Sequence, residues 1–391
     1  MITLKECCSL LTDGDWIESK DQSNSGIRLI QTGNIGIGEY LEKIGRAKYI
    51  NEETFQRLGC TEVLPGDILV SRLPEPVGRA CIVPKKSERM ITAVDCSILR
   101  VNKSIVSTKY LLYFLQSSNY FNQLSGKLAG TTRTRISRKN LEKVELDIPP
   151  IDVQNKISSV LDNVTTIRKI YKKELQMLDD LIKARFVEMF GNCRTNPKNW
   201  ETVALGNIAD VGSSKRVFVN ELQEKGIPFF RGTEIGALAE GKEINPELFI
   251  TEDHYNELVK ATGAPIIGDL LMPSICPDGR IWVVNTTEPF YFKDGRVLWV
   301  HSINNHFDPV FLLYTLKDRI MTDYGSIASG TTFAELKIFA LKQCQVFDVP
   351  IEMQKSFAAF VTQVDKSKAV VQKALDEAQL LFDSLMQQYF G

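Results

Sequence analysis

Residues 150–191 read PIDVQNKISSVLDNVTTIRKIYKKELQMLDDLIKARFVEMFG, and this stretch occurs a second time in the chain. Residues 350–391 read PIEMQKSFAAFVTQVDKSKAVVQKALDEAQLLFDSLMQQYFG and align with it without a gap, displaced by 200 residues throughout. Gln154, for example, recurs as Gln354. The exact register indicates that the length of this segment is fixed.

Both copies predict one long helix. Each begins just after a proline, whose missing amide hydrogen costs nothing at a helix start, and Asp152 and Glu352 place negative charge in the first turn. No Gly or Pro interrupts either copy, so about 39 residues at 1.5 Å each make a rod of roughly 58 Å. Apolar residues, Val160 and Ile167 among them, recur at three- and four-residue steps. A single apolar stripe of this kind needs a partner, and the nearest one is the other copy.

We therefore expect the two helices to pack antiparallel as an intramolecular coiled coil, related by a pseudo-two-fold axis. By symmetry Gly391 then takes the place of Gly191 and lies near Leu4, so the two ends of the chain are close together. A plain two-helix scaffold in a tandem duplication is the alternative. The predicted core of the helix pair consists of Ile157, Val164, Tyr171, Leu178, Phe357, Val364, Val371, Leu375 and Phe382.

The repeat is longer than the helices. The motif YLLYFL at residues 110–115 matches FLLYTL at 311–316, and a GTT motif begins at both Gly130 and Gly330. Each half therefore holds a globular segment followed by a long helix. The predicted fold class is α+β, with two mixed α/β globular domains joined by the helix pair. The predicted boundaries are 1–147 and 195–347 for the globular domains and 148–194 and 348–391 for the helical segments.

Local patterns predict the elements of the globular domains. Short runs rich in β-branched residues, such as IRLI at 27–30, ILV at 68–70, IWVV at 281–284 and VLWV at 297–300, are punctuated by Gly and Pro turns and predict strands. One helix is well signalled in each domain, from Thr108 and from Asp308. Asp308 is predicted to cap the second helix, and Pro309 is predicted to lie in its first turn.

Composition is that of an ordinary soluble protein of 391 residues with a net charge of −1. No apolar run approaches the roughly 18 residues that span a bilayer, and the first residues lack the apolar core of a signal peptide. Three histidines and eight cysteines without a C-x-x-C pair exclude ordinary zinc-ligand spacing and predict reduced, mostly buried thiols. Residues 1–147 carry 21 Lys and Arg against 17 Asp and Glu, whereas residues 195–347 carry 14 against 19. We therefore expect a cytoplasmic protein that meets any anionic ligand through local basic clusters.

The motifs of the common enzyme classes are absent from the sequence. It contains no P-loop, no G-x-S-x-G motif, and no NPPY or DPPY motif of an amino-methyltransferase. The GNIGIG run from Gly33 to Gly38 does not have dinucleotide-binding spacing and predicts a turn. Scaffold glycines recur between the copies, while polar loop residues differ. This pattern is typical of two binding modules with different ligands.

The first candidate for recognition is QTGN at residues 31–34, matched by RGTE at 231–234. Gln and Asn can bond the edge of adenine and Arg that of guanine, while a carboxylate accepts from cytosine. A polar β-turn explains the same residues equally well. The candidate contacts are Gln31, Asn34, Arg231 and Thr233.

The second candidate is Ser71 and Arg72 with Arg79, matched by Ser274 and Arg280. A preceding Gly-Asp turn and strand would present these side chains at a strand end. A solvated turn is the alternative.

The third candidate is the basic stretch TTRTRISRK at 131–139, where cations and hydroxyls suit phosphate contacts. The second copy reads TTFAELK and is far less basic. A solvated charged face is the alternative. The candidate contacts are Thr131, Thr132, Arg133, Arg135 and Arg138, with Thr331 and Thr332 in the second copy.

The architecture resembles the specificity (S) subunit of type I restriction–modification systems. The resemblance rests on GDILVSR, AGTT and PPIDVQ in the first half and on GDLLMPS, SGTT and VPIEMQ in the second. Each motif is weak alone, but their occurrence twice and in the same order, about 200 residues apart, covers essentially the whole chain.

The resemblance implies a non-catalytic subunit whose globular units are target recognition domains. Each domain would read one part of a split double-stranded DNA target, and the helices would set the separation and bind two modification (M) subunits. S-adenosylmethionine and adenine methylation would then belong to the M subunits, and ATP-driven translocation and cleavage to restriction (R) subunits. S-adenosylmethionine, ATP and Mg would all be held by partner subunits, so that this chain binds no cofactor and no metal. The resemblance implies no membrane partner.

Two departures and two alternatives stand beside this expectation. Pro149-Pro150 becomes Val349-Pro350, which predicts a slightly different start for the second helix, and the second domain is acidic. A single-chain methyltransferase would need motifs that the sequence lacks. A coiled-coil scaffold with two protein-binding modules would need no affinity for DNA.

Overall fold

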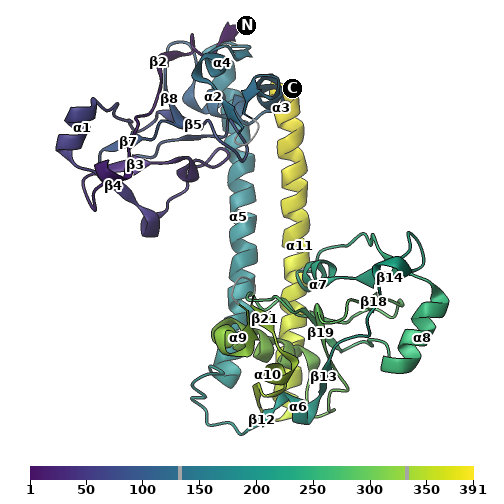
Figure 1. The fold of residues 1–391 in the computed structure, drawn as a ribbon. Coiled ribbons are helices and arrows are strands. Elements are labelled where there is room, and N and C mark those ends of the chain that lie inside the picture. Colours follow the sequence, from purple (N-terminus) through teal and green to yellow (C-terminus); the bar gives the residue numbers. More distant parts are fainter. Residues whose placement is uncertain (131–133, 331–333) are drawn as a thin grey trace. The chain divides into compact units, whose positions relative to one another are not determined.

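A computed structural model describes residues 1–130, 134–330 and 334–391 (Figure 1). The chain divides into two compact units. Unit 1 comprises Met1–Lys173 and Gln372–Gly391, and unit 2 comprises Glu174–Val371. Each unit therefore contains one globular segment and part of both long helices.

Unit 1 is built on two small sheets. Its strands are β1 (Ile2–Thr3), β2 (Cys8–Asp13), β3 (Ile27–Ile30), β4 (Lys48–Ile50), β5 (Ile68–Ser71), β6 (Ala80–Ile82), β7 (Met90–Thr92), β8 (Cys96–Val101), β9 (Leu128–Ala129), β10 (Arg135–Ile136) and β11 (Glu145–Leu146). The larger sheet is antiparallel, in the order β2-β8-β5-β6, and the smaller has the order β4-β3-β7 with β3 parallel to β7. Two pairs, β1-β11 and β9-β10, complete the strands.

Unit 2 repeats this arrangement. Its strands are β12 (Thr202–Ala204), β13 (Asp210–Gly212), β14 (Ile227–Phe230), β15 (Phe249–Ile250), β16 (Leu270–Pro273), β17 (Trp282–Val283), β18 (Tyr291–Phe292), β19 (Val297–His301), β20 (Ala328–Ser329), β21 (Glu335–Leu336) and β22 (Gln345–Phe347). The orders β13-β19-β16-β17 and β15-β14-β18, with β14 parallel to β18, are those of unit 1. The predicted duplication is thus confirmed in strand order.

Further helices lie between these strands in the chain. They are α1 (Glu52–Leu58), α2 (Thr108–Phe114), α3 (Ser118–Ser125), α4 (Arg138–Glu142), α6 (Leu205–Ile208), α7 (Gly232–Ala239), α8 (Glu252–Thr262), α9 (Pro309–Ile327) and α10 (Ile338–Lys342), with 3-10 turns η1 (Ser19–Asp21), η2 (Thr32–Asn34), η3 (Ile44–Arg46) and η4 (Val219–Glu221). Five of these helices begin at a residue whose side chain caps the first turn: α1, α3, α4, α8 and α9. As predicted, the Asp308 carboxylate caps α9, accepting from the amides of Val310 at 2.8 Å and Phe311 at 3.3 Å. Unit 2 has the helix α7 where unit 1 has only η2.

The two long helices are α5 (Ile151–Phe190) and α11 (Ile351–Phe390), of 40 residues each. They begin at equivalent residues, so the expected difference at the start of the second helix is wrong. Its reason is that Pro150 and Pro350 alone set the boundary, because a proline amide is not needed in the first turn.

The helices pack antiparallel within each unit. In unit 1, Leu161 near the start of α5 shares a core with Met386 and Phe390 at the end of α11. Tyr110 of α2 joins this core, with its ring centroid 5.1 Å from that of Phe390. Leu4 lies in the same core, which agrees with the expectation that the two ends of the chain lie close together.

In unit 2 the opposite ends of the helices meet. Phe186 and Phe190 of α5 pack against Phe357 of α11, with ring centroids 5.5 and 5.7 Å from that of Phe357. The ring centroid of Phe311 of α9 lies 4.8 Å from that of Phe190. Burial of each such ring contributes about 1.5–3 kcal/mol, so the helix ends are firmly tied to the globular part of this unit.

The apolar stripe of α5 is rotated by one residue from the predicted one in unit 1. Val160 and Ile167 are exposed, whereas Leu161 is fully buried and Arg168 lies with its guanidinium carbon 4.5 Å from the ring centroid of Phe382. Residues one apart on a helix repeat with the same seven-residue spacing, so spacing alone did not separate the two rows. Of the predicted helix-pair core, Val164, Phe357, Val364 and Val371 are buried, and Ile157, Tyr171, Leu178, Leu375 and Phe382 are half-buried.

A buried glutamine fastens each long helix to its globular segment. The side-chain oxygen of Gln154 accepts from the amide of Ser107 at 2.7 Å, and its nitrogen donates to the carbonyls of Ile105 at 3.1 Å and Pro149 at 2.8 Å. Gln354 makes the same three bonds in unit 2, to Asp308, His306 and Val349. All partners are backbone groups, so the arrangement does not depend on the neighbouring side chains.

No helix among residues 1–130, 134–330 and 334–391 is long and apolar enough to cross a membrane.

Candidate nucleic-acid interface

The end of strand β5 joins two of the candidate regions in unit 1. The amide of Arg72 donates to the carbonyl of Asp95 at 2.8 Å, and its carbonyl accepts from the amide of Ile136 at 3.2 Å. The Arg72 side chain returns to the same strand, donating from Nε to the carbonyl of Ile136 at 2.9 Å. The basic stretch around β10 is therefore held against the strand end.

The sequence predicted that the strand end would present its arginines to a ligand, but the structure buries them instead. Arg72 is 7% exposed, and one of its guanidinium nitrogens lies 2.6 Å from the carboxylate of Asp13. Arg79 is 8% exposed and donates to the carbonyls of Ile35 at 2.7 Å and Thr32 at 2.9 Å, and to that of Leu73 at 2.8 Å. Burial lowers the pKa of Arg79. Both side chains serve the internal structure of the unit in this conformation.

Three shorter polar candidates are also buried: Ser71, Ser274 and Asn34. The Asn34 side chain closes its own turn, accepting from the amide of Gln31 at 3.0 Å and donating to the carbonyl of Leu41 at 3.0 Å. This placement matches the turn alternative for the QTGN motif, with the Asn34 side chain directed inward.

Among the described candidates of unit 1, Arg135 is exposed, whereas Gln31 and Arg138 are half-buried, with 42% of the Arg138 side chain exposed. The Arg135 side chain is 48% exposed and lies 3.5 Å from the carboxylate of Asp95. Arg138, in the first turn of α4, lies 3.5 Å from Glu142. Pairs this open to water contribute about 0–1 kcal/mol, so a phosphate can compete for these cations. The candidates Thr131, Thr132, Arg133, Thr331 and Thr332 lie outside the described residues.

In unit 2 the motif RGTE opens helix α7. Glu234 bonds the Arg231 amide at 2.7 Å, and its carboxylate lies 2.6 Å from the Arg231 guanidinium. Burial alone would raise the pKa of Glu234, but these bonds from Arg231 lower it to about 2. Thr233 is exposed, and its hydroxyl also bonds Glu234. Arg280 is paired with Asp278 at 2.8 Å, so the arginines of this region carry carboxylate partners.

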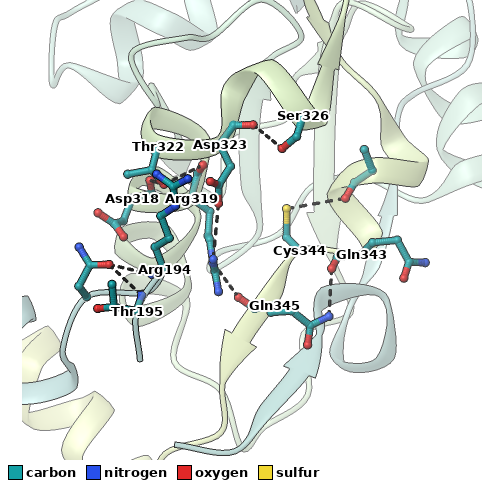
Figure 2. Close-up of polar contacts among 12 residues, drawn as sticks. Arg194, Thr195, Asp318, Arg319, Thr322, Asp323, Ser326, Gln343, Cys344 and Gln345 are labelled. Atoms are coloured by element: carbon teal, nitrogen blue, oxygen red, sulfur yellow. Dashed lines mark hydrogen bonds and ion pairs between the residues drawn. The ribbon is translucent and has the colours of Figure 1, made fainter. Parts of the chain in front are cut away.

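A second polar cluster surrounds helix α9 of unit 2 (Figure 2). Arg319 bonds the Gln345 carbonyl of β22 at 3.3 Å and lies 3.5 Å from Asp323. Burial raises the pKa of Cys344 to about 11 and that of Cys193 to about 12, so both thiols are neutral near pH 7. These contacts join α9 to β22 and account for the cluster as part of the fold.

Sequence reasoning missed Arg296, which precedes strand β19. Its carbonyl accepts from the amide of Ser274 at 2.9 Å, and its guanidinium is paired with Glu335. In unit 1 the equivalent positions hold Asp95 and Arg135. The signal in the sequence was this reversal of charge between the two copies.

Two stretches of the chain, residues 1–179 and 197–379, each match the type I restriction modification DNA specificity domain. Together they cover most of the chain. This chain belongs to the type I DNA specificity family. The family thus accounts for the duplication, because one domain occurs in each half and includes most of the helix that follows it.

Relatives of this specificity protein align with most of its length at modest identity. A putative type I restriction enzyme specificity subunit of Methanocaldococcus jannaschii is 23% identical over 387 residues, which cover 91% of this chain and 86% of the relative. A putative type I restriction enzyme specificity subunit of Haemophilus influenzae is 24% identical over 292 residues, covering 73% of this chain and 71% of the relative.

Solved structures show the same fold. A chain from a type I restriction–modification system, solved to explain complex assembly and conformational transition, has a TM-score of 0.57 at 16% identity and covers 100% of this chain and 96% of its own length. The type I restriction–modification S subunit from M. genitalium has a TM-score of 0.53 at 14% identity, covering 100% and 95%. The likeness confirms the predicted fold class.

Proposed function

We propose that this specificity protein is the non-catalytic subunit that reads a bipartite double-stranded DNA target for a type I restriction–modification complex. The observation that carries the proposal is the double match to the specificity domain, with one strand order in both units and different loop side chains. One scaffold repeated with unlike loops suits two readers of unlike sequences. The globular segments 1–147 and 195–347 would each read one part, and the helices would fix their separation.

The proposed mechanism begins with electrostatic docking. Solvent-accessible cations such as Arg135 and Arg138 of unit 1 would contact phosphates, which position the protein without reading sequence. Side chains of the exposed loops, Gln31 and Thr233 among them, would then contact base edges. The methylated adenine would be flipped into a partner subunit, where S-adenosylmethionine binds, and ATP and Mg would also be held by partner chains. Such a complex acts on DNA in the cytoplasm.

Two copies of the M subunit are the proposed partners of the long helices, with R subunits joining the same complex. Apolar residues are exposed at the same repeat positions of the two helices: Ile170 and Val370, and Leu181 and Leu381. Exposed apolar residues that recur in this way suit two copies of one partner, because each copy would meet the same side chains. A scaffold with two protein-binding modules is the second candidate, and the same exposed residues would serve it.

Binding measurements on the purified chain, alone and with its M partners, separate these functions. We expect duplex DNA affinity that falls by about a thousandfold between 50 and 200 mM salt if six phosphates are contacted. We expect labelled S-adenosylmethionine to bind only when M subunits are present. Cofactor binding by the chain alone would identify an enzyme, and DNA affinity that does not respond to salt would favour the scaffold.

Charging the exposed apolar residues should weaken partner binding. We expect the pair Ile170→Asp and Val370→Asp to lower affinity for M subunits about thirtyfold or more, because each buried aliphatic side chain contributes about 1.5–3 kcal/mol. Titration calorimetry measures the change. The matched control places the same substitution at the exposed polar residues Lys172 and Gln372. Equal M affinity in the test and control variants would contradict the proposed contact.

A further inference from the structure

The two units carry the same backbone junction with opposite charges on it. In unit 1 the strand-end residue Arg72 bonds the carbonyl of Asp95 and the amide of Ile136. In unit 2 the strand-end residue Ser274 bonds the carbonyl of Arg296 at 2.9 Å and the amide of Leu336 at 2.7 Å. Asp95 is thus equivalent to Arg296.

The partner of each residue is reversed in the same way. Arg135, just before Ile136, pairs with Asp95, whereas Glu335, just before Leu336, pairs with Arg296. One cation and one carboxylate therefore occupy this junction in both units. In unit 1 the cation lies on β10 and the carboxylate just before β8, whereas in unit 2 the carboxylate lies on β21 and the cation just before β19. Glu335 replaces a cation in the second copy of the basic stretch, but Arg296 supplies a cation at the same junction.

The cation is the more exposed partner in both units. The side chains of Arg135 and Asp95 are 48% and 28% exposed, and those of Arg296 and Glu335 are 57% and 29% exposed. An approaching anion would meet the guanidinium first in either unit, with the carboxylate holding it from the less exposed side. Exposed pairs of this kind contribute little to stability, so retention of the pair through a charge reversal calls for another reason.

The junction of unit 2 also adjoins a second candidate region. A Cβ atom on Gly232 would lie 3.4 Å from the carbonyl oxygen of Arg296, so the first turn of α7 packs directly on this residue. Gly232 lies between Arg231 and the exposed Thr233. Arg296 is therefore placed beside the motif that the sequence singled out for recognition.

We propose that Arg296 is the phosphate-contacting cation of unit 2, taking the role that Arg135 has in unit 1, and that Glu335 and Asp95 position the two guanidinium groups. The inference rests on the proposed DNA-reading function and names the residue through which the acidic second unit contacts the backbone. The ligand is a DNA phosphate, so Arg296 contributes affinity without choosing a base.

The test uses the chain in complex with its M subunits and a DNA duplex that contains the sequence which the complex methylates. Arg296→Gln should weaken binding about tenfold, reduce the slope of log affinity against log salt by about one, and leave the preferred sequence unchanged. Arg135→Gln should do the same through unit 1. Lys260→Gln, at an exposed lysine of α8, is the control and should bind like the wild type.

A charge exchange separates position from charge. The double variant Arg296→Asp with Glu335→Arg recreates the arrangement of unit 1 and should recover affinity and salt slope to within about threefold of the wild type. Arg296→Asp alone should bind more weakly than Arg296→Gln. If the wild type binds DNA with a steep salt dependence while Arg296→Gln keeps its full affinity and slope, the inference is wrong and the DNA-reading function stands. A wild type without salt-dependent DNA binding would overturn both.

Discussion

Replacing Gln354 with methionine is expected to destabilise unit 2 by about 3–5 kcal/mol. The glutamine is fully buried and satisfies three backbone groups, and each buried group left without a partner costs about 1–3 kcal/mol. Methionine has a similar volume, so the loss reflects hydrogen bonding and not a cavity. Hydrogen exchange should show the loss around residues 305–316, where the amide of Asp308 loses its acceptor.

The two copies of the glutamine serve as controls for each other. Gln154→Met should lower protection around residues 104–115 in unit 1 and leave 305–316 unchanged. Gln372→Met, in which the replaced amide is exposed and bonds Asp376 at 2.8 Å, should change stability by less than about 0.5 kcal/mol. Full protection around Asp308 in the Gln354 variant would show that the buried amide does not fasten α11.

Much of the fold could be predicted from the sequence because its signals are local. Pro150 and Pro350 mark the helix starts, Asp308 marks the cap of α9, and the repeat predicts two units of one topology. The predicted apolar stripe on α5 is partly wrong, because it runs through Val160, whereas the structure buries the neighbouring Leu161. Both residues begin rows with the same seven-residue spacing, and only packing selects between these rows.

The candidate site was less predictable because burial of a polar side chain depends on distant segments. Arg79 is held by carbonyls of Ile35 and Thr32, and Arg72 by Asp13. Strand-end arginines with such partners and strand-end arginines facing a ligand have the same sequence pattern. Arg296 was overlooked because its importance appears only when the junctions of the two units are compared.

Exchange of the first globular segment should change one part of the DNA target and leave the other part intact. The segment 1–147 ends before the helix start, and Gln154 holds it through the backbone groups of Ser107 and Ile105. A segment from another specificity subunit can therefore be received without matching those side chains. Tyr113, which bonds Asp162 of α5 at 2.7 Å, should be retained in the donor segment.

Mapping methylated adenines in cells that carry the exchanged chain and its M partners tests the central claim most directly. If each unit reads its own part of the target, the mapped sequence will keep one part and the spacing between the parts, and the other part will become that of the donor subunit. A mapped sequence that is unchanged, or that changes in both parts, would contradict the claim that the two units are independent readers.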